Sequence, residues 1–240
     1  KFIDIKSKVK IRQIKERGTG YLINFIASTE YHYTYENQPE TTNFFRIGTY
    51  HSMNLDNIDG QWLISKEWYT DPFADSLNTE NIKVDEFKQY LLSLDSRNFS
   101  NLNKRRLSAV EYADRYCGAA SDEQYGYAYN KKYRDYNPLG GDCANFASQI
   151  LYEGGKFKQT GVWRYEKDGS KAWVNAHAFN SYMLHSGRGS LIAKGTYNQI
   201  FKASFKLLPG DYIAYEKKGK VVHISVVTGA DSKGYSLVSC

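Results

Sequence analysis

The sequence predicts an α+β protein in which an antiparallel β-sheet comes first and a helix-plus-sheet region follows. Residues 1–72 contain long β-branched and aromatic runs separated by short turn motifs, which is typical of a β-meander. Residues 101–240 begin with amphipathic helical patterns and end with strand-like runs. A polar stretch at 73–100 separates them. We therefore expect two domains joined by a helical linker.

Four strands are expected in the N-terminal domain, because alternating or continuous apolar runs are separated by turn motifs. They include residues 8–14, 21–35, 42–53 and 61–69. Long strands joined by short loops form a curved sheet. Such a sheet resembles nuclear-transport-factor-like and cystatin-like folds, which we take as the two expectations for this domain.

The rest of the chain is predicted to be helical first and then antiparallel β. One helix is expected at 84–94 in the linker and another at 103–116. A long irregular region, 156–206, contains two short helical candidates. Three strands close the chain, at 211–216, 221–228 and 235–240.

Composition narrows the classes of function. The chain has 240 residues, of which 41% are hydrophobic and 24% charged, as in globular proteins. The net charge is +6, but acidic residues lie among the lysines and arginines, which favours a solvated surface over a nucleic-acid groove. No apolar run is long enough to span a membrane. The chain starts at Lys1 without a methionine or a signal segment, and we interpret it as a processed chain.

The three cysteines, Cys117, Cys143 and Cys240, limit the redox and metal chemistry. An odd number cannot complete a disulfide framework, so at least one thiol stays free in a monomer. No cysteine or histidine pair has zinc-ligand spacing, and no metal or organic cofactor is expected. We expect Cys117 to be a small buried hydrophobic residue.

Cys143 is the strongest candidate for a catalytic residue. It follows a glycine pair at 140–141, and the glycine pair at 154–155 ends the apolar helical pattern that comes after it. Asp142 is a good N-cap, so Cys143 is predicted to lie in the first turn of a helix. The helix dipole there favours the thiolate, which is a nucleophile.

A cysteine nucleophile needs a base, and His223 is the best placed of the five histidines. It lies in the strand pattern at 221–228, where alternation puts Val222 and Ile224 on the opposite face. A rigid strand can direct an imidazole towards a helix start that packs across it. His177, in the irregular region, is the second choice.

A third group should orient the imidazole. If Thr228 pairs with Tyr235 across the last turn, Cys240 lies opposite His223, and the orienting residue would lie at Cys240 or beyond it. Two acidic residues are weaker candidates for this role: Asp211 and Asp231.

Five further residues are expected to support the site or to line its cleft: Asp142, Asn145, Gln149, Trp163 and Trp173. Asn145 and Gln149 are polar residues on an otherwise apolar helix, so we interpret them as buried hydrogen-bonding supports. The two tryptophans fit either the core or a wall of the substrate cleft. The backbone N–H of Cys143 is suited to one side of an oxyanion hole.

From about residue 103 to 240, the chain resembles the amidase domain family of Gram-positive bacteria. Five segments carry the resemblance: NKRRLSAVEYADRYC, DCANFASQILYEGG, GVWRYEKDGSKAWVNAHAF, LPGDYIAY and HISVVTG. The family pattern is close to DCTNFVSQ with a later HxxxVTG, and this chain departs from it at Ala144 and Ala147. That family is related to the NlpC-like and CHAP cysteine peptidases, so the resemblance implies a papain-like fold.

The resemblance also implies a function. Cys143 would be the nucleophile and His223 the base of a cysteine-dependent amide hydrolase. The implied substrate is a peptide or amide, with peptidoglycan as the expected source, and the implied location is extracellular or at the bacterial cell surface. Three alternatives stay open: a non-catalytic module that binds wall peptide, an acyltransferase that uses the same thioester, and a ligand-binding or dimerising role for the meander.

Overall fold

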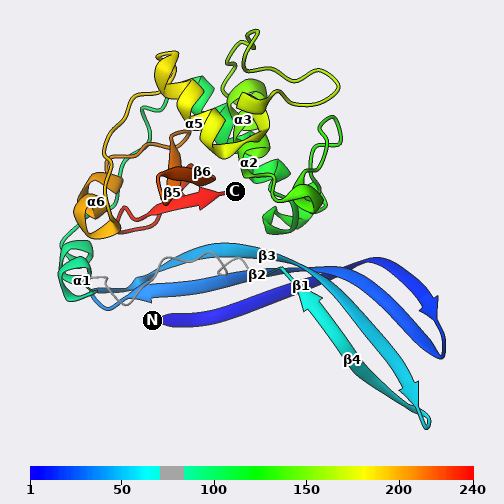
Figure 1. Ribbon diagram of the computed structural model, residues 1–240. Helices are drawn as coiled ribbons and strands as arrows, with labels where there is room; N and C mark the ends of the chain where they lie inside the picture. Colours follow the sequence, from blue (N-terminus) through cyan, green and yellow to red (C-terminus); the bar gives the residue numbers. More distant parts are fainter. Residues whose placement is uncertain (71–83) are drawn as a thin grey trace. The chain divides into compact units, whose positions relative to one another are not determined.

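The computed structural model describes residues 1–70 and 84–240, which divide into two compact units. Of these residues, 1–70 and 118–128 form one unit, and 84–117 and 129–240 form the other. The α+β class is confirmed: a four-stranded antiparallel sheet comes first, and helices with a three-stranded sheet come later (Figure 1). The predicted domain boundary near 72 and the first part of the predicted linker, up to 83, lie outside the described residues.

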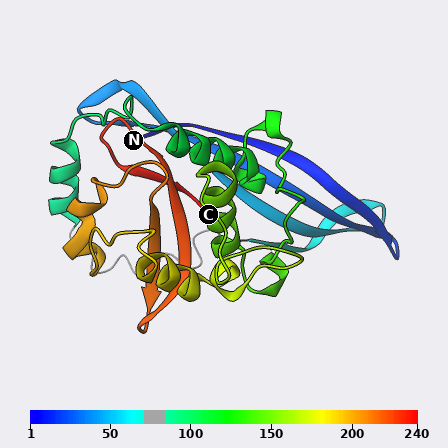
Figure 2. The ribbon, with the colours of Figure 1, turned by 90° about the horizontal axis from the view of Figure 1, so that it is seen from above.

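The sheet of the first unit is the predicted meander, with the strand order β1-β2-β3-β4. Its strands are longer than the predicted runs: β1 (Phe2–Arg17), β2 (Gly20–Tyr35), β3 (Gln38–Ile58) and β4 (Gln61–Tyr69). Gly18 and Gly60 take φ values of +59° and +84° in two of the hairpin turns, a conformation that suits glycine. Figure 2 shows the long strands β1 to β3 side by side.

A segment from the middle of the chain completes the first unit. Residues 118–128 pack on β2 and β3, where Ala119 and Tyr127 form a buried cluster with Ile26. Gly48 allows the close approach, because a Cβ there would lie 2.3 Å from the backbone of Ala119. The stretch expected to form a single C-terminal domain therefore contributes to both units.

The second unit packs helices against the sheet β5-β6-β7. Its strands are β5 (Tyr212–Lys217), β6 (Lys220–Ala230) and β7 (Ser236–Ser239). Its α-helices are α1 (Val84–Leu92), α2 (Lys104–Tyr116), α3 (Cys143–Gln149), α4 (Lys171–Val174), α5 (Ala176–His185) and α6 (Tyr197–Ser204). In Figure 1, α2, α3 and α5 lie on one side of this sheet, and all three contact β6. The region between α3 and β5 thus holds three short α-helices rather than the two expected.

Short helical turns fill the remaining connections. They are η2 (Gly118–Ala120), η3 (Glu123–Tyr125), η4 (Asn137–Leu139) and a π-helical turn, η5 (Ile150–Gly154). The π turn continues α3 directly, and the N–H of Gly155 closes it on the carbonyl of Ile150 at 2.9 Å. Gly154 lets this turn approach α2, because a Cβ there would lie 2.5 Å from Ala109.

The last two strands differ from the predicted alternation and register. Tyr215 pairs with His223 but Glu216 pairs with Val221, so Val222 is an extra residue that bulges outwards, 55% exposed. The expectation that Val222 shares the buried face of Ile224 is therefore wrong.

The closing hairpin is also shifted by two residues. Val226 pairs with Ser239, which brings Cys240 beside Ser225 rather than opposite His223 as expected. An irregularity between Val227 and Gly229 and a five-residue connection produce the shift.

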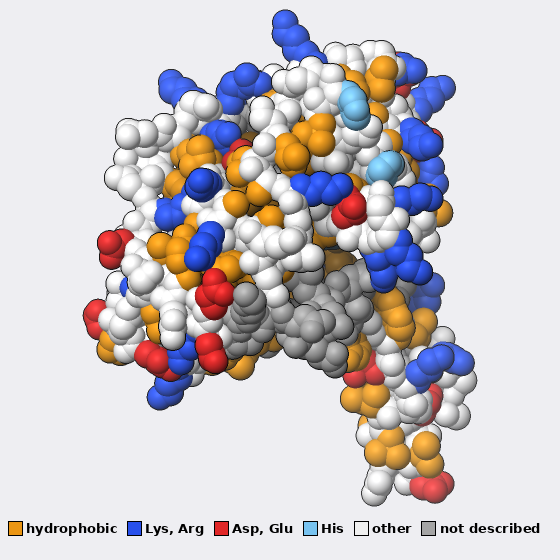
Figure 3. Space-filling model, turned by 60° about the vertical axis from the view of Figure 1, so that its left-hand side comes forward, with side chains coloured by type: hydrophobic (Ala, Val, Ile, Leu, Met, Phe, Trp, Pro, Cys, Tyr) orange, Lys and Arg blue, Asp and Glu red, His pale blue; other side chains and the backbone are white. Residues whose placement is uncertain are grey.

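Figure 3 shows lysine and arginine side chains spread over the visible face with acidic side chains among them. No helix in the described part of the chain is both long and apolar enough to cross a membrane.

Candidate active site

The backbone before Cys143 is set by two glycines. Gly140 and Gly141 have φ values of +114° and +126°, which residues with a Cβ rarely adopt. The helix α3 then begins at Cys143, and the N–H of Phe146 bonds to the carbonyl of Asp142 at 2.8 Å. The prediction that Cys143 lies in the first turn of a helix is confirmed.

Asp142 occupies the N-cap position, but its side chain does not cap the helix, contrary to expectation. Its ψ of 0° differs from the extended value of a capping residue. Instead, Oδ1 accepts hydrogen bonds from the N–H of Tyr136 and from Nδ2 of Asn145, both at 2.9 Å. Burial of the carboxyl raises the pKa of Asp142 to about 6.

Asn145 connects three parts of the second unit. Its Nδ2 donates to Asp142 and also to the carbonyl of Arg134 at 3.1 Å. Its Oδ1 accepts the indole N–H of Trp173 at 2.9 Å. The residue is fully buried, so these bonds satisfy polar atoms that would otherwise be costly to bury.

Trp163 and Trp173 belong to the core. Both are fully buried, and their rings stack with centroids 4.7 Å apart. Ser148 of α3 joins them, because it accepts the indole N–H of Trp163 and donates to the carbonyl of Trp173. Of the two alternatives for these tryptophans, the cleft wall is therefore wrong. Gln149 is also buried, and its Oε1 accepts the hydroxyl of Tyr112 at 2.9 Å.

The sulfur of Cys143 lies against β6. The backbone N–H groups of Ile224 and Ala144 hydrogen-bond it. Ile224 directly follows His223 in the strand. The structure thus brings Cys143 to the residue next to the predicted base.

The electrostatics at Cys143 differ from the expectation. Burial raises the pKa of the thiol above its ordinary 9.0, and the charges of Cys240 and Asp142 act in the same direction. The N–H groups of Ile224 and Ala144 lower it but do not compensate. The expectation that the helix start makes Cys143 a thiolate is wrong, because desolvation outweighs the local dipoles. At neutral pH the residue is a thiol, and a base must remove its proton before it can attack.

Two imidazoles lie near the first half of β6. His223 is half-buried, and its ring lies beside that of Tyr215 on β5, with centroids 5.5 Å apart. His177, in the first turn of α5, accepts the N–H of Val221 through Nδ1 at 3.3 Å. The other three histidines lie elsewhere. His185 is at the end of α5 in the second unit, and His32 and His51 are on β2 and β3 of the first unit.

Tyr215 is a neighbour of the predicted base that the sequence did not identify. Its hydroxyl hydrogen-bonds Ser225, and the Ser225 hydroxyl also contacts the Cys240 sulfur. Burial raises the pKa of Tyr215. The strand containing Tyr215 was predicted, but its pairing with His223 depends on the bulge at Val222, which leaves no signal in the alternation pattern.

Asp211 and Asp231, the weaker candidates for an orienting carboxylate, hold turns. Asp211 accepts hydrogen bonds from Arg106 of α2 at 2.9 Å and from the N–H of Leu208 at 2.8 Å. Asp231 accepts the N–H groups of Lys233 and Tyr235, both at 2.9 Å. Among the described residues, no group of three or more His, Cys, Asp or Glu side chains is placed to hold a metal ion.

The chain belongs to the family described as "Putative amidase domain", whose model matches residues 103–240. This membership suggests amide hydrolysis. The chain is similar to the uncharacterized protein YjcM of Bacillus subtilis (strain 168), with 32% identity over 128 residues. That alignment covers 45% of this chain and 30% of YjcM, so the match spans about a third of the relative's length. No solved structure matches the chain.

Proposed function

We propose that the protein hydrolyses amide bonds through a thioester on Cys143, with His223 as the base. The observation that carries the proposal is the position of the Cys143 sulfur. It lies at the start of α3 and against the N–H of Ile224, the residue that follows His223 in β6. Family membership supports an amide as the bond that is cleaved.

The reaction needs a base because the resting Cys143 is a thiol. His223 takes the thiol proton as the sulfur attacks the amide carbonyl carbon, which gives a tetrahedral oxyanion. The imidazolium then protonates the leaving nitrogen, the C–N bond breaks, and an amine and a thioester result. Water attacks the thioester with His223 again as base, which releases a carboxylic acid and regenerates the thiol. We assign stabilisation of the oxyanion to the backbone N–H of Cys143, because the first N–H groups of a helix have no intrahelical partner.

We extend the proposal to a papain-like site of the NlpC-like and CHAP type. Its support is the order of parts: a cysteine at a helix start, followed by a histidine on an antiparallel sheet. The substrate class we propose is cell-wall peptide, met outside the cell or at its surface. The resemblance of the segments from residue 103 onwards supports this choice.

Turnover tests the nucleophile. The full chain is incubated with soluble stem peptides from digested peptidoglycan and with simple N-acyl amino acid amides, and the products are identified by mass spectrometry. Cys143→Ala should abolish hydrolysis, whereas Cys117→Ala should leave it unchanged. Equal turnover by Cys143→Ala and the unmodified protein would refute the assignment.

Alkylation by iodoacetamide tests the base without a substrate. If His223 accepts the thiol proton, His223→Asn should slow alkylation of Cys143 at pH 7 by about tenfold or more. His185→Asn, which changes the exposed histidine at the end of α5, is the matched control and should have no effect. An unchanged rate for His223→Asn would remove the base from the proposal.

A non-catalytic module that binds wall peptide is the second candidate, and the raised pKa of Cys143 favours it. In that case stem peptides bind but are not cleaved. Alkylation then follows the pH dependence of a buried thiol in both the unmodified protein and His223→Asn.

A further inference from the structure

The first sheet has a hollow of about 320 Å³ that the proposed hydrolysis does not use. Six side chains line it: Arg17, Leu22, Ser52, Asn54, Lys66 and Trp68. They come from all four strands of the meander, near the β1–β2 and β3–β4 turns. The hollow therefore belongs entirely to the first unit.

The strand register explains why these residues meet. Leu22 pairs with Asn54, and Asn54 with Lys66, so they form one row across the sheet. Ser52 and Trp68 pair in the neighbouring row on the same face. These pairings fix the backbone beneath the hollow.

The hollow has an excess of positive charge. Among the described residues, neither Arg17 nor Lys66 forms an ion pair, whereas Lys8 of β1 pairs with Glu123 of η3. Asp56 lies on this face two residues beyond Asn54, and its carboxylate accepts the Ser65 hydroxyl. Glu30 lies on the same face eight residues beyond Leu22, and its carboxylate pairs with Arg46. A guanidinium and an ammonium at one hollow attract an anion and bind it through charge-assisted hydrogen bonds.

The uncharged lining adds a second kind of recognition. The Ser52 hydroxyl and the Asn54 amide offer donors and acceptors that match the hydroxyl groups of a ligand. Trp68 is 58% exposed, and within the described part of the chain its indole is in contact with no other aromatic ring. An exposed indole face packs well against the apolar face of a sugar ring.

We propose that this hollow binds a sugar or polyol that carries a phosphate or carboxylate group. Arg17 and Lys66 bind the anionic group, Ser52 and Asn54 bind hydroxyl groups, and Trp68 packs against the ring. The inference does not depend on Cys143, so it stands or falls separately from the amide hydrolysis.

Calorimetric titration of the full chain with four probes tests the proposal. The probes are glucose 6-phosphate, glucuronate, glucose and inorganic phosphate. Either charged sugar should bind at least about tenfold more tightly than glucose, and the tighter of the two identifies the anionic group. Both interactions should weaken with added salt, because exposed charges are screened.

Variants assign the binding to the hollow. Arg17→Gln and Lys66→Gln should each lower the affinity for the charged sugar by about tenfold. Trp68→Ala should lower the affinity for the charged sugar but leave the affinity for inorganic phosphate unchanged.

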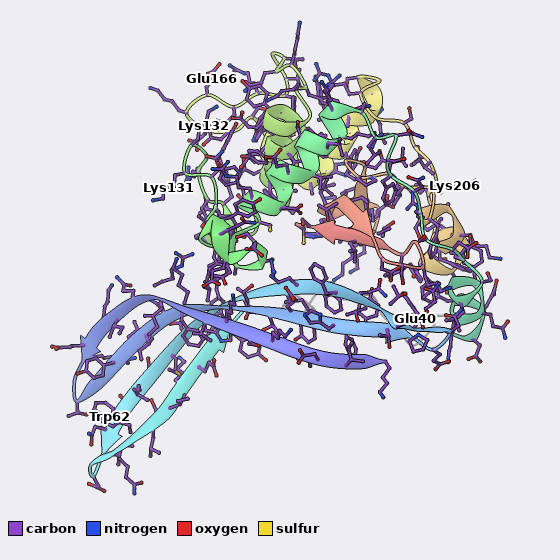
Figure 4. The ribbon with its side chains drawn as sticks, turned by 180° about the vertical axis from the view of Figure 1, so that it is seen from behind. Glu40, Trp62, Lys131, Lys132, Glu166 and Lys206 are labelled. Carbon is purple, nitrogen blue, oxygen red and sulfur yellow. The ribbon has the colours of Figure 1, made fainter. Side chains whose placement is uncertain are left out.

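Two matched variants serve as controls and should change nothing. Trp62→Ala alters the other tryptophan of β4, which is labelled in Figure 4. This indole stacks on Tyr21 with ring centroids 5.6 Å apart. Lys131→Gln alters an exposed lysine of the second unit. Circular dichroism checks that each variant is folded. The proposal is overturned if neither charged sugar outbinds glucose, or if the control variants weaken binding as much as Arg17→Gln and Lys66→Gln.

Discussion

Asp142 is the half-buried carboxyl next to Cys143, and its hydrogen bonds come from uncharged donors. The donors are the N–H of Tyr136 and the amide of Asn145. Because the charged form is poorly solvated there, the pKa is raised from 3.8 to about 6. The folded protein therefore binds a proton at this residue more tightly than the unfolded chain does.

This difference predicts a pH dependence of stability. Protonation of Asp142 stabilises the fold fully below about pH 3.8, and this contribution is lost as the pH rises through about 6. Asp142→Asn keeps an oxygen acceptor for both donors and removes the charge. We expect it to raise the free energy of unfolding at pH 8 by about 1–3 kcal/mol relative to the unmodified protein.

Urea unfolding of both proteins at pH 4 and pH 8 measures this effect. The stability gain from Asp142→Asn should shrink as the pH is lowered to 4. Taking the difference between the two proteins cancels the opposite contributions of carboxyls with lowered pKa, such as Glu30 and Glu153. A gain that is equal at both pH values would contradict the prediction.

We expect the hydrogen bonds of Asn145 to stabilise the folded protein as well as to hold α3 in place. Asn145→Ala leaves the indole N–H of Trp173 and the carbonyl of Arg134 without their buried partner. Stability should fall by about 2–4 kcal/mol, because buried polar groups then stay unsatisfied. Chemical denaturation measures the loss, with the exposed Asn101→Ala as control. A loss no larger than that of the control would show that the network does not hold α3.

At this scale motif and spacing predicted Cys143 as nucleophile and His223 as base, and these two roles stay predictions. The expectation that Asn145 and Gln149 are buried hydrogen-bonding residues is confirmed. It did not identify the protonation state of Cys143. The pKa of that thiol depends on how tightly β6 and α3 pack around the sulfur, and burial of this kind has no local sequence signal.

Among the elements of the first unit, the contact between β3 and η2 is a tight packing constraint. Gly48→Ala would place a methyl group 2.3 Å from the backbone of Ala119, where neither strand nor turn can move without losing contacts. We expect this change to cost about 1–3 kcal/mol by overpacking. Gly161→Ala, at a position with nothing within 4 Å, should cost less than about 1 kcal/mol. Thermal unfolding compares the two variants, and equal effects would contradict the packing argument.

The sequence predicted most elements because periodicity determines them locally. The four meander strands, α2, α3 and the last three strands all match apolar patterns. The register of β5, β6 and β7 could not be predicted in the same way. A single bulged residue, Val222, and a two-residue shift in the closing hairpin change which side chains meet, yet leave the apolar pattern almost intact.

At the scale of the whole molecule, residues 118–128 depend on the first unit for their packing, although segments of the second unit precede and follow them in the chain. If residues 1–83 are removed, Ala119 and Tyr127 lose the buried contact with Ile26. In this truncated chain, we expect hydrogen exchange at 118–128 to become at least about tenfold faster than in the full chain. Exchange in α3, which packs within the second unit, serves as the internal reference.

Mass spectrometric hydrogen exchange on both chains measures the change. Unchanged protection at 118–128 would mean that the segment is ordered without the meander. Faster exchange in α3 as well would mean that the second unit does not fold alone. Either result would contradict the division of roles inferred from the contacts.

The packing of residues 118–128 also has a consequence for the region matched by the family. The family match begins at residue 103, but the stretch 118–128 inside it is completed by a sheet that lies before it in sequence. A chain that contained only the matched region would lack the sheet on which residues 118–128 pack, and the apolar side of Tyr127 would be exposed to water. Residues 118–128 would then need another surface on which to bury Ala119 and Tyr127.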